Sequence, residues 1–407
     1  MEAVFETPLK TLDVATALFA PLQKKLDELR ENGLYRTFYE FSHISEHPGH
    51  TAHGGRVVQV WSGNDYFGLG QHPDLIKAQI ESTQLHGTSS GGSRNIGGTS
   101  VSHAELEKRI AAWHGKDRAL VFSSGYAANF ETLSTLIAAI PDMVVFSDRN
   151  NHRSLIEGIA RTGCAKHVFP HNDHEALDRM LAGYERERPK LIVFESVYSM
   201  DGDVAPLGAF FDLAEKHGAL TFLDETHAIG LMGPTGAGLA EELNDHRATF
   251  VQGVFSKALG TLGGYVAGPD SAIDYVRSHA PGFIFSSTMP QAVLDATLTG
   301  LDIVQRGDDL RRGVMDNVIR LKNALRKAGL RFLDGGTHIV PVIVPGGERV
   351  HRVSRRLLDE FGIYVAPVTY PSVPKGTERF RVTIAPFRTP EQIEAFVSTL
   401  QLCLEQE

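Results

Sequence analysis

Cysteine is nearly absent from this chain, which contains two of these residues, Cys164 and Cys403, among 407. Neither lies in a Cys-x-x-Cys pair or at a spacing typical of metal ligands. A disulfide framework or a zinc-binding module is therefore excluded as the basis of the fold. The sequence predicts two free thiols in a reducing compartment and no metal site.

Long apolar segments are also missing. No run reaches the roughly 18 apolar residues that a membrane-spanning helix requires. Residues 1–20 mix charged with apolar side chains and lack the hydrophobic stretch of a secretory signal. We therefore expect a cytoplasmic protein without a transmembrane segment, while a peripheral contact with a membrane surface stays open.

Basic tracts are absent as well. The net charge is −9, and acidic and basic residues are mixed along the chain. Nucleic acid is therefore not an expected partner. The chain has no internal repeat, and 42% of its 407 residues are hydrophobic, which favours a large α/β domain with a smaller second domain.

Short apolar runs alternate with helical patterns between residues 104 and 224. The runs at 119–123, 143–147, 190–195 and 220–224 have the length and composition of buried parallel strands. Helical spacing covers 104–114, 154–162, 174–181 and 207–217. This order predicts βαβ units and a mostly parallel sheet, in which ligands bind at the carboxyl ends of the strands. Glu195, Asp224 and the turn 123–125 fall at such ends.

The two ends of the chain follow other patterns. Apolar residues recur at helical spacing from Leu12 to Asn32, which predicts a packing arm or a dimer element. The C-terminal region alternates predicted helices (310–328 and 350–361) with predicted strands (338–344, 363–368 and 380–384). We therefore expect an N-terminal arm (1–50), a large domain (51–306) and a small α+β domain (307–407). The last strand is expected to carry Arg381 into the cleft.

The most informative segment runs from Leu220 to Gly264. It places Asp224 at a strand end and Lys257 33 positions later, within Phe-Ser-Lys-Ala-Leu-Gly. Pyridoxal phosphate (PLP) requires a lysine for its Schiff base and an acid that keeps its pyridine nitrogen protonated. Alone, such a lysine is typical of a surface and such an aspartate of a helix cap. Together they predict a PLP site.

Two further groups suit the same cofactor. The segment Ser124–Tyr126 follows a strand and precedes a helix, so its backbone N–H groups are placed to bind a phosphate. His152 follows two asparagines and is expected to stack on the pyridine ring. Taken separately, these residues are also typical of an ordinary turn and of a helix start.

These segments resemble the α-oxoamine synthases, a family of fold-type I PLP enzymes, over residues 35–392. The resemblance implies a large domain with a seven-stranded, mostly parallel sheet. It also implies that Lys257 forms the Schiff base, that Asp224 pairs with the pyridine nitrogen, that His152 stacks on the ring, and that His227 binds the phenolic oxygen. The other cofactor-binding positions that it implies are Ser124, Gly125, Tyr126, Glu195, Ser256, Ser286 and Ser287, the last two from a neighbouring subunit.

The resemblance further implies a reaction in which a small amino acid condenses with an acyl thioester and carbon dioxide is lost. Lys257 would remove a proton from Cα, His152 would polarise the thioester carbonyl, and Arg381 would hold the carboxylate. The implied substrates are L-serine or glycine and an acyl-CoA or acyl-carrier-protein thioester, and the implied assembly is a homodimer with shared active sites. The implied substrate-binding positions are Arg36, Asn64, Ser93, Asn95, Ile96, Ser199, Ser372 and Arg381.

Two branches of the family compete for the substrate assignment. Across the whole chain the motifs resemble the 5-aminolevulinate synthases, which use glycine and succinyl-CoA, and there an arginine matching Arg36 meets the succinyl carboxylate. Ser93 and Ser372, however, stand where that branch has threonine. Each lost methyl is worth about 1 kcal/mol, and space beside Cα at Ser93 would favour L-serine over glycine.

The serine palmitoyltransferases share Gly-Ser-Arg at residues 92–94 and Phe-Ser-Lys at residues 255–257 with this chain. The sequence therefore favours a serine palmitoyltransferase that makes 3-ketodihydrosphingosine for sphingolipid synthesis, with a 5-aminolevulinate synthase as the alternative. Arg36 argues against this preference, because a cation at the acyl end suits a dicarboxylic acyl group.

The sequence gives less support to two other kinds of PLP-binding protein. An aminotransferase would share Asp224 and Lys257 but would release a keto acid, and a non-catalytic PLP-binding regulator would turn over no amino acid. Product formation that depends on an acyl thioester distinguishes an α-oxoamine synthase from both alternatives. The remaining histidines, among them His171, His174 and His338, have no metal-ligand spacing and are expected in the core or at the surface.

Overall fold

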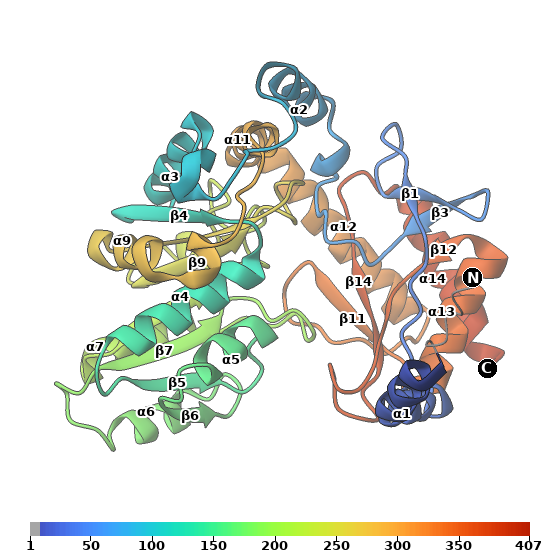
Figure 1. The fold of residues 1–407 in the computed structure, drawn as a ribbon. Coiled ribbons are helices and arrows are strands. Elements are labelled where there is room, and N and C mark those ends of the chain that lie inside the picture. Colours follow the sequence, from blue (N-terminus) through green and yellow to red (C-terminus); the bar gives the residue numbers. More distant parts are fainter. Residues whose placement is uncertain (1–8) are drawn as a thin grey trace, which may run out of the picture.

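The computed structural model describes residues 9–407, and its largest part is a seven-stranded sheet with the order β4-β10-β9-β8-β7-β5-β6 (Figure 1). β10 runs antiparallel to both neighbours, and the other pairs are parallel. The predicted α/β fold with a mostly parallel sheet is confirmed. The strands are β4 (Arg118–Phe122), β5 (Val144–Asp148), β6 (Ala165–Phe169), β7 (Lys190–Glu195), β8 (Leu220–Asp224), β9 (Phe250–Val254) and β10 (Gly264–Gly268).

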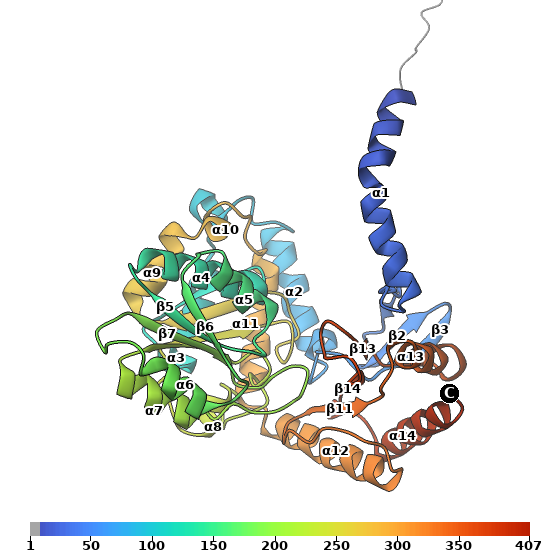
Figure 2. The same cartoon turned by 90° about the horizontal axis from the view of Figure 1, so that it is seen from below.

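Helices cover both faces of this sheet (Figure 2). On one face, Leu191 and Val193 of β7 join a core with α4 (Gly125–Ala139), α5 (Arg153–Ala160) and α9 (Asp270–His279). On the other, Ile192 and Phe194 join a core with α6 (His174–Leu181) and α7 (Leu207–His217). Both faces being buried explains why β7 is a continuous apolar run. The remaining helices of this part are η1 (Leu69–Gln71), α2 (Pro73–His86), η2 (Arg94–Gly98), α3 (Val101–Trp113), α8 (Leu239–Glu242), α10 (Pro281–Ile284) and α11 (Gln291–Gln305).

The C-terminal part forms a second unit beside the large sheet. Its antiparallel sheet has the order β11-β14-β13, and Arg381 pairs with Pro341 at its centre. One predicted strand, 363–368, is divided in two because β12 pairs with β3 whereas β13 pairs with β14. The elements are α12 (Asp308–Lys327), β11 (Ile339–Ile343), α13 (Gly347–Phe361), β12 (Ile363–Tyr364), β13 (Pro367–Val368), β14 (Arg379–Thr383) and α14 (Pro390–Glu405).

The N-terminal strands join this C-terminal unit. β1 (Ser42–His43), β2 (His50–His53) and β3 (Arg56–Val60) make a four-stranded sheet with β12, in which β3 and β12 are parallel. Gln59 and Val60 therefore lie beside Ile363 and Tyr364 although about 300 positions separate the two strands. The domain boundaries at residues 50 and 306 stay predictions, and we propose that strands β1–β3 be counted with the C-terminal unit.

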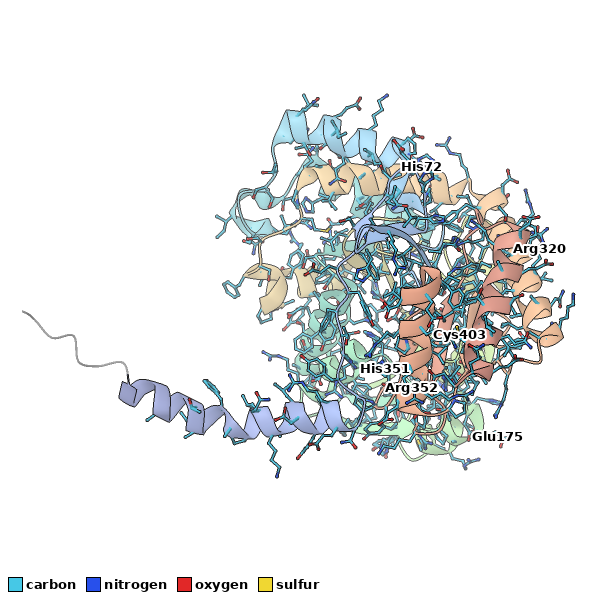
Figure 3. All side chains as sticks on the ribbon, turned by 90° about the vertical axis from the view of Figure 1, so that its right-hand side faces the viewer. His72, Glu175, Arg320, His351, Arg352 and Cys403 are labelled. Atoms are coloured by element: carbon cyan, nitrogen blue, oxygen red, sulfur yellow. The ribbon has the colours of Figure 1, made fainter. Side chains whose placement is uncertain are left out.

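A long helix, α1 (Leu9–Glu31), projects away from the body of the molecule (Figures 2 and 3). Leu18, Phe19 and Leu22 on it are each more than half exposed. The predicted helix is present, but its apolar stripe does not pack against the rest of the chain. That this helix takes part in a dimer stays a prediction.

Both cysteines are free thiols. Among residues 9–407, no helix combines the length and apolar character needed to cross a membrane.

A charged clamp joins the ends of β5 and β6 to the segment after β7. The His171 imidazole donates from Nδ1 to Asp148 at 2.9 Å and from Nε2 to Asp203 at 2.7 Å. Burial opposes the charged ring, but the hydrogen bonds to Asp148 and Asp203 outweigh it and raise the pKa of His171 to about 10. The ring is therefore an imidazolium at neutral pH.

We expect His171→Gln to lower the free energy of unfolding by about 2 kcal/mol near neutral pH, because charge-assisted hydrogen bonds are lost. The folded-state pKa of about 10 lies above the ordinary value of 6.5, so this stabilisation is complete below pH 6.5 and disappears as the pH rises through 10. Melting temperatures between pH 6 and pH 10 should therefore converge for wild type and variant. His174→Gln, at an exposed position on α6, is the control, and a difference that does not depend on pH would contradict the clamp.

Candidate active site

Two carboxylates and a histidine gather where the central strands end. Glu195 and Asp224 are register partners at the last positions of β7 and β8. His152 follows β5, the other neighbour of β7, and its backbone N–H donates to Glu195 Oε1 at 2.6 Å. Burial and the nearby charge of Asp224 raise the pKa of Glu195 well above its usual value.

Asp224 is buried, with 3% of its surface exposed. Its Oδ2 accepts a hydrogen bond from Asn129 Nδ2 at 2.8 Å, and its Oδ1 accepts one from the Thr226 backbone N–H at 2.9 Å. Asn129 lies on α4 and also donates to Ser154 at the start of α5. These contacts fix the orientation of a carboxylate in surroundings of low polarity, where its electrostatic effect is strongest.

Lys257 lies in the turn between β9 and β10 and is half-buried. Burial lowers the pKa of its amine to about 8, although the negative charges of Asp224 and Glu195 oppose this shift. Since the charge of Asp224 acts on the Lys257 pKa, the amine and the carboxylate belong to the same cluster. Among residues 9–407, none forms a hydrogen bond with the Lys257 amine, which leaves it free to react.

A network of polar side chains connects this cluster to the C-terminal unit. The Arg381 guanidinium on β14 donates from Nε to the Ser199 carbonyl at 2.6 Å and from Nη1 to Asn64 Oδ1 at 2.9 Å. The Tyr66 hydroxyl lies 2.7 Å from His227 Nδ1 and 3.3 Å from Arg381 Nη2. Burial, helped by the positive charges of Lys257 and Arg381, lowers the pKa of His227 well below its usual value, so its ring is neutral.

The start of α4 is packed closely against β9. Ser124 caps the helix, and its Oγ accepts a hydrogen bond from the Ala127 backbone N–H at 3.1 Å. A Cβ at Gly125 would lie 2.2 Å from Val254 Cγ1, so only glycine fits beside β9. The first N–H groups of this helix are the kind of site that binds a phosphate.

Comparisons with known proteins agree with this arrangement. The model of the aminotransferase class I and II family matches residues 57–400. 5-Aminolevulinate synthase 2 of Cereibacter sphaeroides is 44% identical over 385 residues, which are 93% of this chain and 94% of that protein. 5-Aminolevulinate synthase of Rhizobium meliloti is 43% identical over 383 residues, 93% and 95% of the two chains. This chain belongs to the α-oxoamine synthases.

Solved structures extend the similarity to the fold of this α-oxoamine synthase. A structure of SPT with PLP is 30% identical, with a TM-score of 0.89 over 96% of this chain and 98% of that one. The serine palmitoyltransferase of Sphingomonas wittichii is 28% identical, with a TM-score of 0.88 and the same coverage. The 8-amino-7-oxononanoate synthase of Francisella tularensis, at 21% identity and a TM-score of 0.73, shares the fold.

PLP is the cofactor of this family, and the residues present fit it. The Lys257 amine has no hydrogen-bond partner among the described residues, and the Asp224 carboxylate is buried and oriented. Gly125 begins α4, where the first backbone N–H groups of the helix are placed to bind the phosphate. This α-oxoamine synthase is thus a PLP-dependent enzyme that transfers an acyl group to carbon.

Other predicted site residues are not among the buried residues of the cluster. Ser93 forms a bridge with Ser287, and its Oγ is buried without a hydrogen-bond partner among residues 9–407. The predicted positions with exposed side chains are Arg36, Asn95, Ile96, Tyr126, Ser256, Ser286, Ser287 and Ser372. Their roles in binding stay predictions.

Three buried residues of the cluster were not predicted as site residues. Tyr66 lies in a motif that resembles the family, but its hydrogen bonds leave no trace in the sequence, and Asn129 is one polar residue within an apolar helix. His338, expected in the core or at the surface, is buried against Tyr66, and neither ring nitrogen has a hydrogen-bond partner among the described residues. A buried polar group left unpaired costs about 1–3 kcal/mol, which packing alone does not justify.

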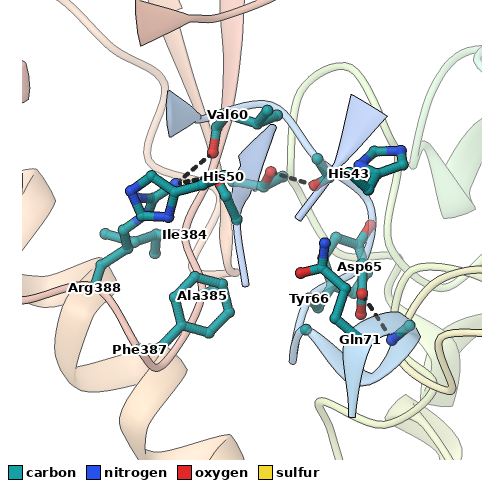
Figure 4. Close-up of a pocket in the computed structure, with 15 residues that line it drawn as sticks. His43, His50, Val60, Asp65, Tyr66, Gln71, Ile384, Ala385, Phe387 and Arg388 are labelled. Carbon is teal, nitrogen blue, oxygen red and sulfur yellow. Dashed lines mark hydrogen bonds between the residues drawn. The ribbon is translucent and has the colours of Figure 1, made fainter. Parts of the chain in front are cut away.

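A cavity of about 270 Å³ adjoins the site between strands β1–β3, η1 and residues 383–388, which lie at the end of β14 and after it (Figure 4). It shares Tyr66 with the site, but neither Lys257 nor Asp224 lines it, so it is not the catalytic pocket. At its edge, Arg388 donates to the Gly49 and Val60 carbonyls, which ties β2 and β3 to the C-terminal unit.

Proposed function

We propose that this enzyme is a 5-aminolevulinate synthase, which condenses glycine with succinyl-CoA and releases carbon dioxide and CoA. The observation that carries the proposal is the identity of 44% with a 5-aminolevulinate synthase along nearly the full length of both chains. The serine palmitoyltransferase structures are more distant, at 28–30% identity. We therefore replace the serine palmitoyltransferase assignment, which the sequence favoured, with its alternative, a 5-aminolevulinate synthase.

The residues of the cluster support this chemistry. PLP, when bound, supplies an acceptor for the electrons released at the amino acid's Cα. Lys257 binds the cofactor and moves the Cα proton, for which a pKa of about 8 suits the amine near neutral pH. Asp224 holds the proton on the pyridine nitrogen, and its contact with Asn129 keeps it oriented.

The polar network supports a site for the amino acid. Arg381 binds the carboxylate, and its bonds to Asn64 and the Ser199 carbonyl orient the guanidinium toward the cluster. His227, kept neutral by burial, binds the phenolic oxygen of the cofactor with the help of Tyr66. His152 stacks on the ring, and its backbone is held by Glu195.

Two residues bear on the choice of substrate. Arg36 is exposed and forms no hydrogen bond or ion pair with any described residue, so its charge is available for the distal carboxylate of a succinyl group. Ser93 is the residue that favours serine, because it lacks the methyl of the threonine in the 5-aminolevulinate synthases. One methyl changes rates only several-fold, so it does not outweigh the similarity along the whole chain.

Purified enzyme with PLP is expected to turn over glycine plus succinyl-CoA at least about tenfold faster than L-serine plus palmitoyl-CoA, since a misplaced substituent in a packed pocket costs at least that much. Release of carbon dioxide and free thiol measures both reactions. Parallel assays with the acyl-carrier-protein thioesters separate the two kinds of donor. Faster turnover of the serine pair would restore serine palmitoyltransferase as the assignment.

We also propose a homodimer in which each site borrows residues from the other chain. The apolar stripe of α1 supports this assembly, because it is exposed in the single chain and a second copy could cover it. Ser286 and Ser287 are exposed as well, which leaves them accessible to a neighbouring subunit. A cytoplasmic location remains a prediction.

A further inference from the structure

His338 is a buried histidine at the edge of the candidate active site. It precedes β11, is 1% exposed, and packs edge-on against the Tyr66 ring with 4.3 Å between ring centroids. Neither of its ring nitrogens has a hydrogen-bond partner among residues 9–407. An apolar side chain would fill this space at lower cost, so the imidazole is available to a partner that residues 9–407 do not supply.

The positive charges near His338 indicate that the partner is negatively charged. Burial and the positive charges of Arg381 and Lys257 lower the pKa of His338 well below its usual value. The ring is therefore neutral and keeps one N–H donor and one acceptor. Since both cations act on the ring, a group that accepts a hydrogen bond from it is expected to be an oxyanion.

Arg381 alone has too few free N–H groups to satisfy a bound carboxylate. Its Nε and Nη1 are already engaged by the Ser199 carbonyl and Asn64, and its Nη2 faces Tyr66 and His227. A carboxylate has about four acceptor positions, more than the remaining guanidinium N–H groups satisfy. His338 packs against the ring of Tyr66, and the Tyr66 hydroxyl lies 3.3 Å from Arg381 Nη2, so the neutral imidazole is placed to supply the missing donor.

We propose that His338 binds the carboxylate of the amino-acid substrate by donating a hydrogen bond from a ring nitrogen, beside Arg381. The inference rests on the proposed function only in requiring an α-amino acid as substrate. It holds for glycine and for L-serine alike, because both carry this carboxylate.

The test is a titration of the PLP-bound enzyme, followed by the visible absorbance of the cofactor, with glycine, L-serine and methylamine. His338→Phe is expected to weaken binding of the amino-acid substrate by at least about tenfold, because a hydrogen bond to a charged group is lost. Binding of methylamine, which has no carboxylate, is expected to be unchanged. His338→Gln, which keeps an N–H donor, is expected to recover part of the loss, and His338→Leu replaces the phenylalanine variant if that variant does not fold.

Steady-state assays provide a second readout. The variant without a donor should raise KM for the amino acid, while KM for the acyl thioester stays at the wild-type value. Equal loss of glycine and methylamine binding would show that His338 acts through packing and would overturn the inference, as would wild-type affinity for the amino acid. If the wild-type enzyme binds L-serine rather than glycine, the proposed function fails. The effect of His338→Phe on L-serine binding then still decides the role of His338. A wild type that binds neither amino acid overturns both.

Discussion

Lys257→Ala is expected to lower turnover by about 10⁴-fold or more, because it removes the amine that binds the cofactor and moves the Cα proton. The amine lies in the field of Asp224 and Glu195, and no other lysine side chain of the described chain is placed in the cluster. Carbon dioxide release from glycine and succinyl-CoA measures the loss. Borohydride treatment followed by mass spectrometry reports whether PLP becomes fixed to the protein.

Lys77→Ala on α2 is the matched control for this prediction. Lys77 is exposed, and among residues 9–407 its one ion pair is with exposed Glu81, a type of contact that contributes little to stability. The control is expected to keep wild-type turnover and to be labelled by PLP. Turnover above about 1% of wild type in Lys257→Ala would show that another group moves the proton.

Asp224→Asn is expected to lower turnover by about 100- to 1,000-fold, the usual cost of removing one preorganised electrostatic contact. The change keeps the size of the side chain but removes the charge that holds a proton on the pyridine nitrogen. Asn129 can adapt, because its Oδ1 has no hydrogen-bond partner among the described residues and an amide flip turns it toward the new amide group. The fold is therefore expected to survive.

The measurement for Asp224→Asn combines turnover with the melting temperature of the PLP-bound enzyme. A fall in turnover with a melting temperature close to wild type assigns the effect to the site. Asp309→Asn, at a fully solvated position on α12, is the control and is expected to change neither quantity. Wild-type turnover in Asp224→Asn would contradict the role of the carboxylate.

The parallel strands were predictable because both faces of the sheet are buried. This makes β7 and β8 short apolar runs, whose predicted limits match the structure, and it places Glu195 and Asp224 at recognisable strand ends. Lys257 was predictable for a different reason, since its motif resembles those of a known family. Local pattern and resemblance together therefore predicted three residues that the structure brings close together, and their roles stay predictions.

Contacts between distant segments were not predictable from local patterns. Tyr66 and His227 meet across 161 positions, and Asn129 reaches Asp224 across 95. Neither pair leaves a periodic signal in the sequence. The split of the predicted strand 363–368 has the same origin, because its halves pair with different sheets. His338 was expected in the core or at the surface and not in the site, because a lone histidine before a strand is an ordinary feature of protein cores.

The pairing of β3 with β12 has a consequence for biosynthesis. The Gln59 backbone N–H donates to the Gly362 carbonyl at 2.8 Å, so the edge of β3 has no partner until the ribosome has added about 300 further residues. Throughout that interval the nascent chain exposes an open strand edge, the kind of surface on which chaperones act and intermolecular association begins. The large sheet can form during translation, whereas the unit that carries Arg381 must close after it. Completion of the active site is therefore one of the last events in the maturation of this enzyme.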